Sequence, residues 1–131
     1  MHASRVKQIA VFLGTVLTLG GCLTPPPPGP NVTHVVLIWL KHPESAADRA
    51  QLIRAAHSLR MIPGVVRVET GRSVPSLGRH VRTDFDLGVV MIFRDQAALA
   101  RYQGDARHRE AAARYLQPLV RHYEIYNLGT R

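Results

Sequence analysis

The sequence predicts an α+β fold, a ferredoxin-like βαββαβ domain whose antiparallel sheet carries its helices on one face. Three observations predict it. Segments with strand and helix periodicity follow one another in that order across residues 32–128. Polar residues that favour helix N-caps precede the expected helices. Residues 32–40 and 85–93 are apolar on both faces, so both faces of these strands must be covered.

The first half of the domain reads as strand, helix and strand. Residues 32–40 form the first strand, and Ser45 opens a capping box for a helix over about 46–60. A Pro-Gly pair ends this helix. Residues 65–72 alternate apolar with polar side chains, which is typical of a strand with one wet face. The segment 71–83 is rich in Ser, Gly, Pro and Arg and predicts a loop.

The second half reads as strand, two helices and strand. Residues 85–93 form the second strand that is apolar on both faces. Asp95 can cap a short helix, and Asp105 can cap another that runs to about residue 117. Residues 120–128 close the domain as a strand.

Helices on one face leave the other face of the sheet uncovered. Exposed apolar area costs about 25 cal/mol per Å², so a second copy packed sheet to sheet is the simplest cover. We therefore expect a homodimer. The side chains expected on the uncovered face are those of Val36, Ile38, Val90 and Ile92 or of their strand partners.

Residues 1–21 have the order of a secretory signal peptide. Arg5 and Lys7 precede roughly eleven apolar or neutral residues, which are too few to span a bilayer as a stable helix. Leu19-Gly20-Gly21-Cys22 resembles the lipobox of bacterial lipoproteins, which implies cleavage before Cys22 and lipidation of its sulfur. An ordinary cleaved signal peptide is the alternative. Cys22 is the single cysteine of the chain, so no intrachain disulfide can form.

Residues 22–31 are expected to be the lipidated cysteine and a proline-rich tether to the domain. In polyproline II geometry, at about 3.1 Å per residue, the tract would span roughly 25 Å. Two or three acyl chains hold a protein on a membrane almost irreversibly. The expected location is the cell envelope, and the resemblance to Gram-negative lipoproteins implies the outer membrane, because Leu23 after Cys22 is not acidic.

The chain is basic, with a formal charge of +8, of which Arg5 and Lys7 would be lost with the signal peptide. The arginines are scattered rather than clustered, and an exported protein does not meet nucleic acid, so we expect no nucleic-acid partner. No pair of histidines has metal-ligand spacing on one expected helix, and no phosphate-binding glycine loop follows a strand. We expect no metal and no cofactor.

Short segments of the domain resemble the Dabb family, the stress-responsive dimeric A/B barrel domains. The resemblance implies a ferredoxin-like protomer whose sheet packs on that of a second copy to form a dimeric α/β barrel, often with a cavity between sheet and helices. Its bacterial members generally have no assigned reaction. The residues that carry it are Thr33-His34-Val35-Val36-Leu37-Ile38, Ile62-Pro63-Gly64-Val65, Asp86 to Phe93, Tyr102-Gln103 and His108.

One plant branch of this family is a polyketide cyclase that uses a tyrosine and histidines of the cavity. By position, the resemblance places these roles on His34, Tyr102 and His108. A common family pattern is Tyr-x-x-His-Pro-x-His, and this chain has Asp105 and Ala106 where that pattern has the middle His-Pro. This chain thus keeps the tyrosine and the last histidine of the pattern and departs from it at the two positions between them.

Three functions follow as hypotheses. The first is a lipid-anchored protein that binds a small apolar or aromatic molecule. The second is a cofactor-free cyclase or isomerase with His108 as base, Tyr102 as orienting acid and His34 as support. The third is a structural or interaction module of the envelope, in which these three side chains only pack or satisfy hydrogen bonds. Haem binding through a histidine is a further alternative, since related A/B barrels include haem-degrading monooxygenases.

Overall fold

The computed structural model describes residues 31–129. The expected signal peptide, Cys22 and the tether as far as Pro30 lie outside these residues. None of the helices within 31–129 is long and apolar enough to cross a membrane. The elements run in the order β1 (Val32–Leu40), α1 (Ala46–Ser58), η1 (Leu59–Met61), β2 (Val65–Gly71), β3 (Leu87–Phe93), α2 (Gln96–Gly104), α3 (Ala106–Ala111), η2 (Ala112–Leu116), α4 (Gln117–Leu119) and β4 (Val120–Gly129).

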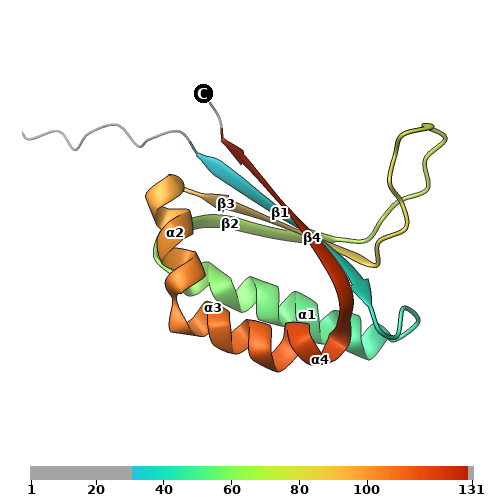
Figure 1. Ribbon diagram of the computed structural model, residues 1–131, viewed down its shortest axis with the longest axis horizontal. Helices are drawn as coiled ribbons and strands as arrows, with labels where there is room; N and C mark the ends of the chain where they lie inside the picture. Colours follow the sequence, from blue (N-terminus) through green and yellow to red (C-terminus); the bar gives the residue numbers. More distant parts are fainter. Residues whose placement is uncertain (1–30, 130–131) are drawn as a thin grey trace, which may run out of the picture.

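The four strands form one antiparallel sheet in the order β2-β3-β1-β4. All helices lie on one face of it, with α1 alongside the segment from α3 to α4 (Figure 1). This is the ferredoxin-like arrangement that the sequence predicts, so the expected fold class is confirmed.

Each long helix begins at the side chain that the sequence indicates. Ser45 Oγ accepts a hydrogen bond from the backbone N–H of Asp48 at 3.1 Å. Asp95 Oδ1 accepts one from the backbone N–H of Ala98 at 2.7 Å, and Asp105 Oδ1 one from that of Arg107 at 2.8 Å. These bonds satisfy N–H groups that have no partner within the helix.

Gly64 brings the turn before β2 into close contact with α2. Its φ is 95°, a conformation that L side chains rarely adopt. A Cβ built on Gly64 would lie 2.5 Å from the Cβ of Ala98. Glycine at this position therefore allows both the turn and the approach of the helix to the sheet.

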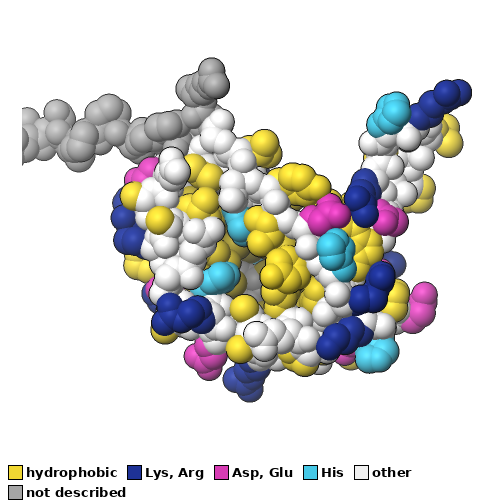
Figure 2. Space-filling model, in the orientation of Figure 1, with side chains coloured by type: hydrophobic (Ala, Val, Ile, Leu, Met, Phe, Trp, Pro, Cys, Tyr) yellow, Lys and Arg dark blue, Asp and Glu magenta, His cyan; other side chains and the backbone are white. Residues whose placement is uncertain are grey.

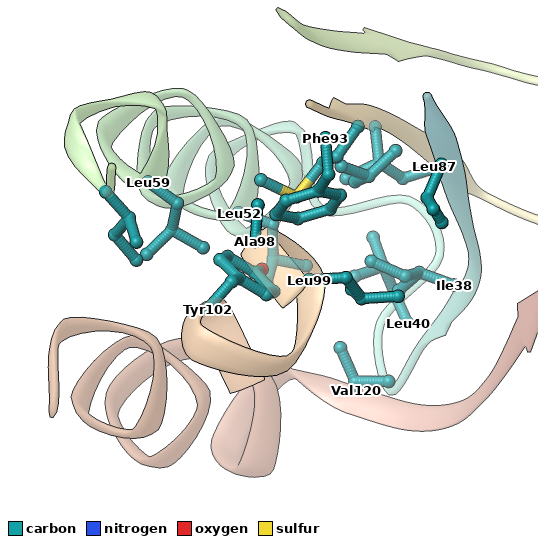
Figure 3. Close-up of a cluster of buried hydrophobic side chains, with 14 residues drawn as sticks. Ile38, Leu40, Leu52, Leu59, Leu87, Phe93, Ala98, Leu99, Tyr102 and Val120 are labelled. Carbon is teal, nitrogen blue, oxygen red and sulfur yellow. The ribbon is translucent and has the colours of Figure 1, made fainter. Parts of the chain in front are cut away.

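The core lies between the sheet and the helices. Leu40, Leu87, Met91 and Phe93 are fully buried on the strand side. Figure 3 shows Phe93 close to Tyr102 of α2, with leucines of α1 and α2 around them. The face of the sheet that the helices cover is thus packed from both sides.

The register decides which of the side chains expected on the uncovered face lie there, and Val36 and Ile38 do not. The register pairs Val36 with Val89 and Ile125, and Val35 with Val90. Directly paired residues share a face, so Val36 follows Val89 to the helix side. The expectation holds for Val90 and Ile92, which lie on the open face together with Val35 and Leu37 of β1, all four half-buried.

Two element boundaries also differ from expectation. The strand expected from residue 85 begins at Leu87, because Asp86 binds the end of β1: its backbone N–H donates to Ile38 O at 2.9 Å, and its carboxylate accepts from the N–H of Leu40 at 2.8 Å. The helix expected to run from Asp105 to about residue 117 is interrupted by η2, a π-helical segment.

The segment between β2 and β3 forms the expected loop and projects from one end of the molecule, on the side of the sheet away from the helices (Figure 1). The end of this loop that precedes β3 contacts the open face of the sheet through a side chain. The guanidinium carbon of Arg82 lies 4.9 Å from the ring centroid of Trp39, and the ring of His122 lies 5.0 Å from it. Trp39 is therefore buried even though it faces away from the helices.

Candidate functional site

An apolar cavity of about 110 Å³ lies between the sheet and the helices. In Figure 2 hydrophobic side chains gather near the middle of the face shown, with Lys and Arg side chains toward its edges. The cavity walls come from β1, β3 and β4 on one side and from α1, η1, α2, α3 and η2 on the other. They consist of Val36, Ile38, Leu52, Ala55, Ala56, Leu59, Val89, Met91, Tyr102, His108, Ala111, Ala112, Tyr115, Leu116, Tyr123 and Ile125.

Small side chains on two helices contribute to this space. Ala55 and Ala56 of α1 and Ala111 and Ala112 of α3 and η2 all line the cavity. Larger residues there would fill the volume, as core positions usually do. Sequence reasoning missed these alanines as site residues. The available signal was a pair of alanines on each of two helices expected on the same side of the sheet.

Tyr102 forms part of the cavity wall at the end of α2. The residue is 3% exposed, and its ring centroid lies 4.9 Å from that of Phe93 and 4.4 Å from that of His108. Burial raises the pKa of the Tyr102 phenol to about 12. Within residues 31–129 no hydrogen-bond partner meets its hydroxyl. At neutral pH Tyr102 is therefore a neutral phenol whose proton is available to a bound molecule.

His108 of α3 lines the same wall and leaves one ring nitrogen without a partner. Its Nδ1 is buried and forms no hydrogen bond to any residue in the described part of the chain. Buried polar atoms are normally satisfied by protein groups or water. An unsatisfied, buried ring nitrogen on a residue of the cavity wall marks His108 as a candidate polar group of the site.

His34 of β1 lies behind Tyr102 and is absent from the cavity lining. It is 5% exposed, and its Nδ1 lies 2.6 Å from Asn127 Oδ1. Because the amide oxygen only accepts, the His34 Nδ1–H donates and its Nε2 carries the lone pair. Burial lowers the pKa of His34, the bond to Asn127 opposes this, and nearby His108 lowers it further. His34 is thus a neutral imidazole.

The rings of the three predicted residues lie next to one another in a row, but only Tyr102 and His108 line the cavity. The ring centroids of His34 and Tyr102 are 6.1 Å apart, and those of Tyr102 and His108 are 4.4 Å apart. Asn127, which orients His34 from β4, was missed by sequence reasoning. Asn127 lies 93 residues after His34 in the chain, so no local sequence pattern indicates this pairing.

Asp105, which stands where the common family pattern has a histidine, has a structural role here. Besides capping α3, its carboxylate pairs with the Arg107 side chain, with an Nη2 to Oδ2 distance of 2.8 Å. These bonds to Arg107 hold the pKa of Asp105 at about 2. Asp105 therefore stays ionised and bound to Arg107 at neutral pH. Residues 31–129 contain no group of three or more His, Cys, Asp or Glu side chains placed to hold a metal ion.

The family model described as the Stress responsive A/B Barrel Domain, Dabb, matches residues 32–127. The chain belongs to the Dabb family. A crystal structure of a Dabb family protein with a ferredoxin-like fold from Mesorhizobium loti is 25% identical to it, with a TM-score of 0.65. The match covers 78% of this chain and 98% of that one. No curated protein matches the chain.

Two further solved structures share the fold of this Dabb protein. A dimeric ferredoxin-like protein of unknown function from Thermobifida fusca is 20% identical, with a TM-score of 0.62, over 78% of this chain and 92% of that one. The hydroxynitrile lyase of Passiflora edulis is 20% identical, with a TM-score of 0.63, over 80% of this chain and 96% of that one. The fold therefore occurs both in a dimer without an assigned function and in an enzyme.

Proposed function

We propose that this Dabb protein is a lipid-anchored binding protein of the cell envelope, which holds a small apolar or aromatic molecule between its sheet and helices. The observation that carries the proposal is the apolar cavity walled by paired alanines of two helices. A cavity of about 110 Å³ is close in size to the engineered apolar cavity of about 150 Å³ that binds benzene. One aromatic ring or a short alkyl chain is the group that fits.

The protein acts as a homodimer in this proposal. Val35, Leu37, Val90 and Ile92 offer an apolar strip on the open face of the sheet, and Tyr126 and Leu128 of β4 are 49% and 59% exposed. Exposed apolar surface of this kind is typical of an interface. The dimeric relative from Thermobifida fusca supports a pair of such protomers.

Native mass spectrometry of the full chain, extracted in mild nonionic detergent without ligand removal, tests both statements. The expected result is a dimer that carries additional mass from a small molecule. An empty dimer would favour an interaction module of the envelope instead, and an empty monomer would contradict the binding function and the dimer together.

A pair of neighbouring substitutions shows whether the retained molecule occupies this cavity. Ala112→Leu places a larger side chain into the cavity, whereas Ala113 is exposed and outside the lining, so Ala113→Leu is the matched control. We expect Ala112→Leu to lose the retained mass and Ala113→Leu to keep it. Equal retention by both variants would place the molecule elsewhere.

A second candidate is cofactor-free acid–base catalysis in the same cavity, and the buried, unpartnered His108 Nδ1 favours it. In this function His108 takes a proton from a carbon next to a carbonyl of the bound molecule and later returns it. The neutral Tyr102 hydroxyl donates a hydrogen bond to that carbonyl oxygen. His34, held by Asn127, supports Tyr102 from behind.

The retained molecule, once identified, separates catalysis from binding. If the protein is an enzyme, His108→Ala abolishes turnover while folding and dimer mass stay unchanged, and Tyr102→Phe lowers turnover with little change in the retained ligand. His57→Ala, which removes a histidine outside the cavity lining, is the control. Turnover that survives His108→Ala rules out this mechanism.

The lipid anchor has its own test. Cys22→Ser removes the proposed acceptor sulfur, so the full chain should move from the membrane fraction to the soluble fraction or keep its uncleaved signal peptide. In a Gram-negative host the unchanged protein should fractionate with the outer membrane. Recovery of correctly processed Cys22→Ser protein in the membrane fraction would reveal a different anchor.

A further inference from the structure

A polar depression adjoins the apolar cavity on the outer side of the helices. One side of the depression is formed by residues of α1, namely Ala47, Ala50, Gln51 and Arg54. The other side is formed by Arg114 and Tyr115 of η2. Tyr115 also lines the apolar cavity. This one half-buried side chain thus lies between an apolar space inside and a polar depression outside.

The depression is positively charged. Arg54 and Arg114 are both exposed, and neither forms an ion pair with any residue from 31 to 129. No acidic side chain belongs to its lining. The guanidinium carbon of Arg114 lies 5.5 Å from the ring centroid of Tyr115, within the range of a cation–π contact. One of the two positive charges therefore lies beside the shared side chain.

The backbone at this point departs from a regular α-helix. Arg114 and Tyr115 belong to the π-helical segment η2, and π-turns inside α-helices frequently occur at functional sites. The interruption coincides with the residues that line both spaces, since Ala112, Tyr115 and Leu116 of η2 face the cavity. The apolar cavity and the polar depression thus meet at the π-helical turn of η2.

We propose that the ligand of this cavity is an amphipathic anion, an aromatic or short aliphatic carboxylate. Its apolar group occupies the cavity, and its carboxylate passes Tyr115 to reach Arg54 and Arg114. Guanidinium groups suit this role because their planar N–H groups match the two carboxylate oxygens. The inference rests on the proposed binding function and narrows its ligand class.

A pair of probes that differ only in charge tests the inference. 3-Phenylpropanoate and 3-phenylpropanamide carry the same ring and chain, and equilibrium dialysis against the full-length protein in nonionic detergent measures both affinities. At low salt we expect the acid to bind several-fold more tightly than the amide. Arg54→Gln and Arg114→Gln should each weaken the binding of the acid about two- to fivefold, which is the range of an exposed ion pair. Neither substitution should change the affinity for the amide.

Arg101→Gln is the matched control, because Arg101 is an exposed arginine of α2 that lines neither space. It should leave both affinities unchanged. Equal binding of acid and amide by the unchanged protein, or an equal effect of Arg101→Gln, overturns the anion inference and leaves the binding function standing. If neither probe binds, both the anion inference and the proposed binding function fail.

Discussion

The two faces of the sheet are built from the same strands and have opposite environments. On the helix side, Met91 and Phe93 of β3 are fully buried around a row of rings and an apolar cavity. On the open side, their neighbours Val90 and Ile92 are half-buried in one protomer. Strand alternation thus separates a face that lines an apolar cavity from a face that the helices leave open.

The largest expected effect comes from a charge placed on the open face. Val90→Asp would bury an unpaired carboxylate in the proposed dimer interface, at a cost of several kcal/mol, so dimer association should fall by at least about a hundredfold. Size-exclusion chromatography with light scattering would then show a monomer. Met61→Asp, at an exposed position on the helix side, should leave the dimer intact. A dimeric Val90→Asp protein would mean that the copies pair elsewhere.

Truncation of adjacent residues compares the faces directly. Met91→Ala should lower the free energy of unfolding by about 2–5 kcal/mol, because it leaves a cavity in a packed core. In the monomeric Val90→Asp background, Ile92→Ala should cost no more than about 1 kcal/mol, since Ile92 is only half-buried in one protomer. Denaturant unfolding measures both changes. Similar losses would show that the open face is stabilised within the protomer.

Gly64→Ala tests the close contact on the helix side. The positive φ of Gly64 should make the change cost more than about 1 kcal/mol, and the short distance to Ala98 adds to it. Gly71 has open space around it and no positive φ, so Gly71→Ala should leave stability nearly unchanged or slightly raised. Thermal unfolding of the two variants gives the difference, and equal melting temperatures would contradict the tight packing at Gly64.

The smallest expected effect is a pH dependence that belongs to the helix side. Burial lowers the pKa of His34 in the folded protein, so the unfolded chain binds its proton more readily. Its contribution to stability is therefore complete above about pH 6.5 and is lost as the pH falls from there through the folded pKa. His34→Gln should flatten the fall between pH 7.5 and 5, measured by denaturant unfolding, whereas His80→Gln at an exposed site should not.

Local signals predicted the elements well because caps and turns act over a few residues. Ser45, Asp95 and Asp105 cap the helices that the sequence indicates. The faces of β1 were harder to assign, because its residues from Val35 to Leu40 are all apolar and show no alternation that marks its orientation. Only the register with β3 shows that Val36 lies on the helix side.

The candidate site was predicted in part for the same reason. The positions of His34, Tyr102 and His108 could be carried over from the family resemblance, and the structure places their rings in a row. The fixation of His34 by Asn127 and the π-helical turn at Arg114 depend on contacts between distant segments. Periodicity carries no information about such contacts.

By itself the sequence determined the order of the elements, the helix starts and the Dabb resemblance, and it predicts lipidation at Cys22. These features depend on neighbouring residues, whose backbone preferences and hydrogen bonds are local. The tertiary structure alone decided which face of each strand meets the helices, where paired alanines leave a cavity, and that Tyr115 lies between this cavity and two exposed arginines. Such features depend on strand register and on the packing of helices, which bring together side chains far apart in the chain.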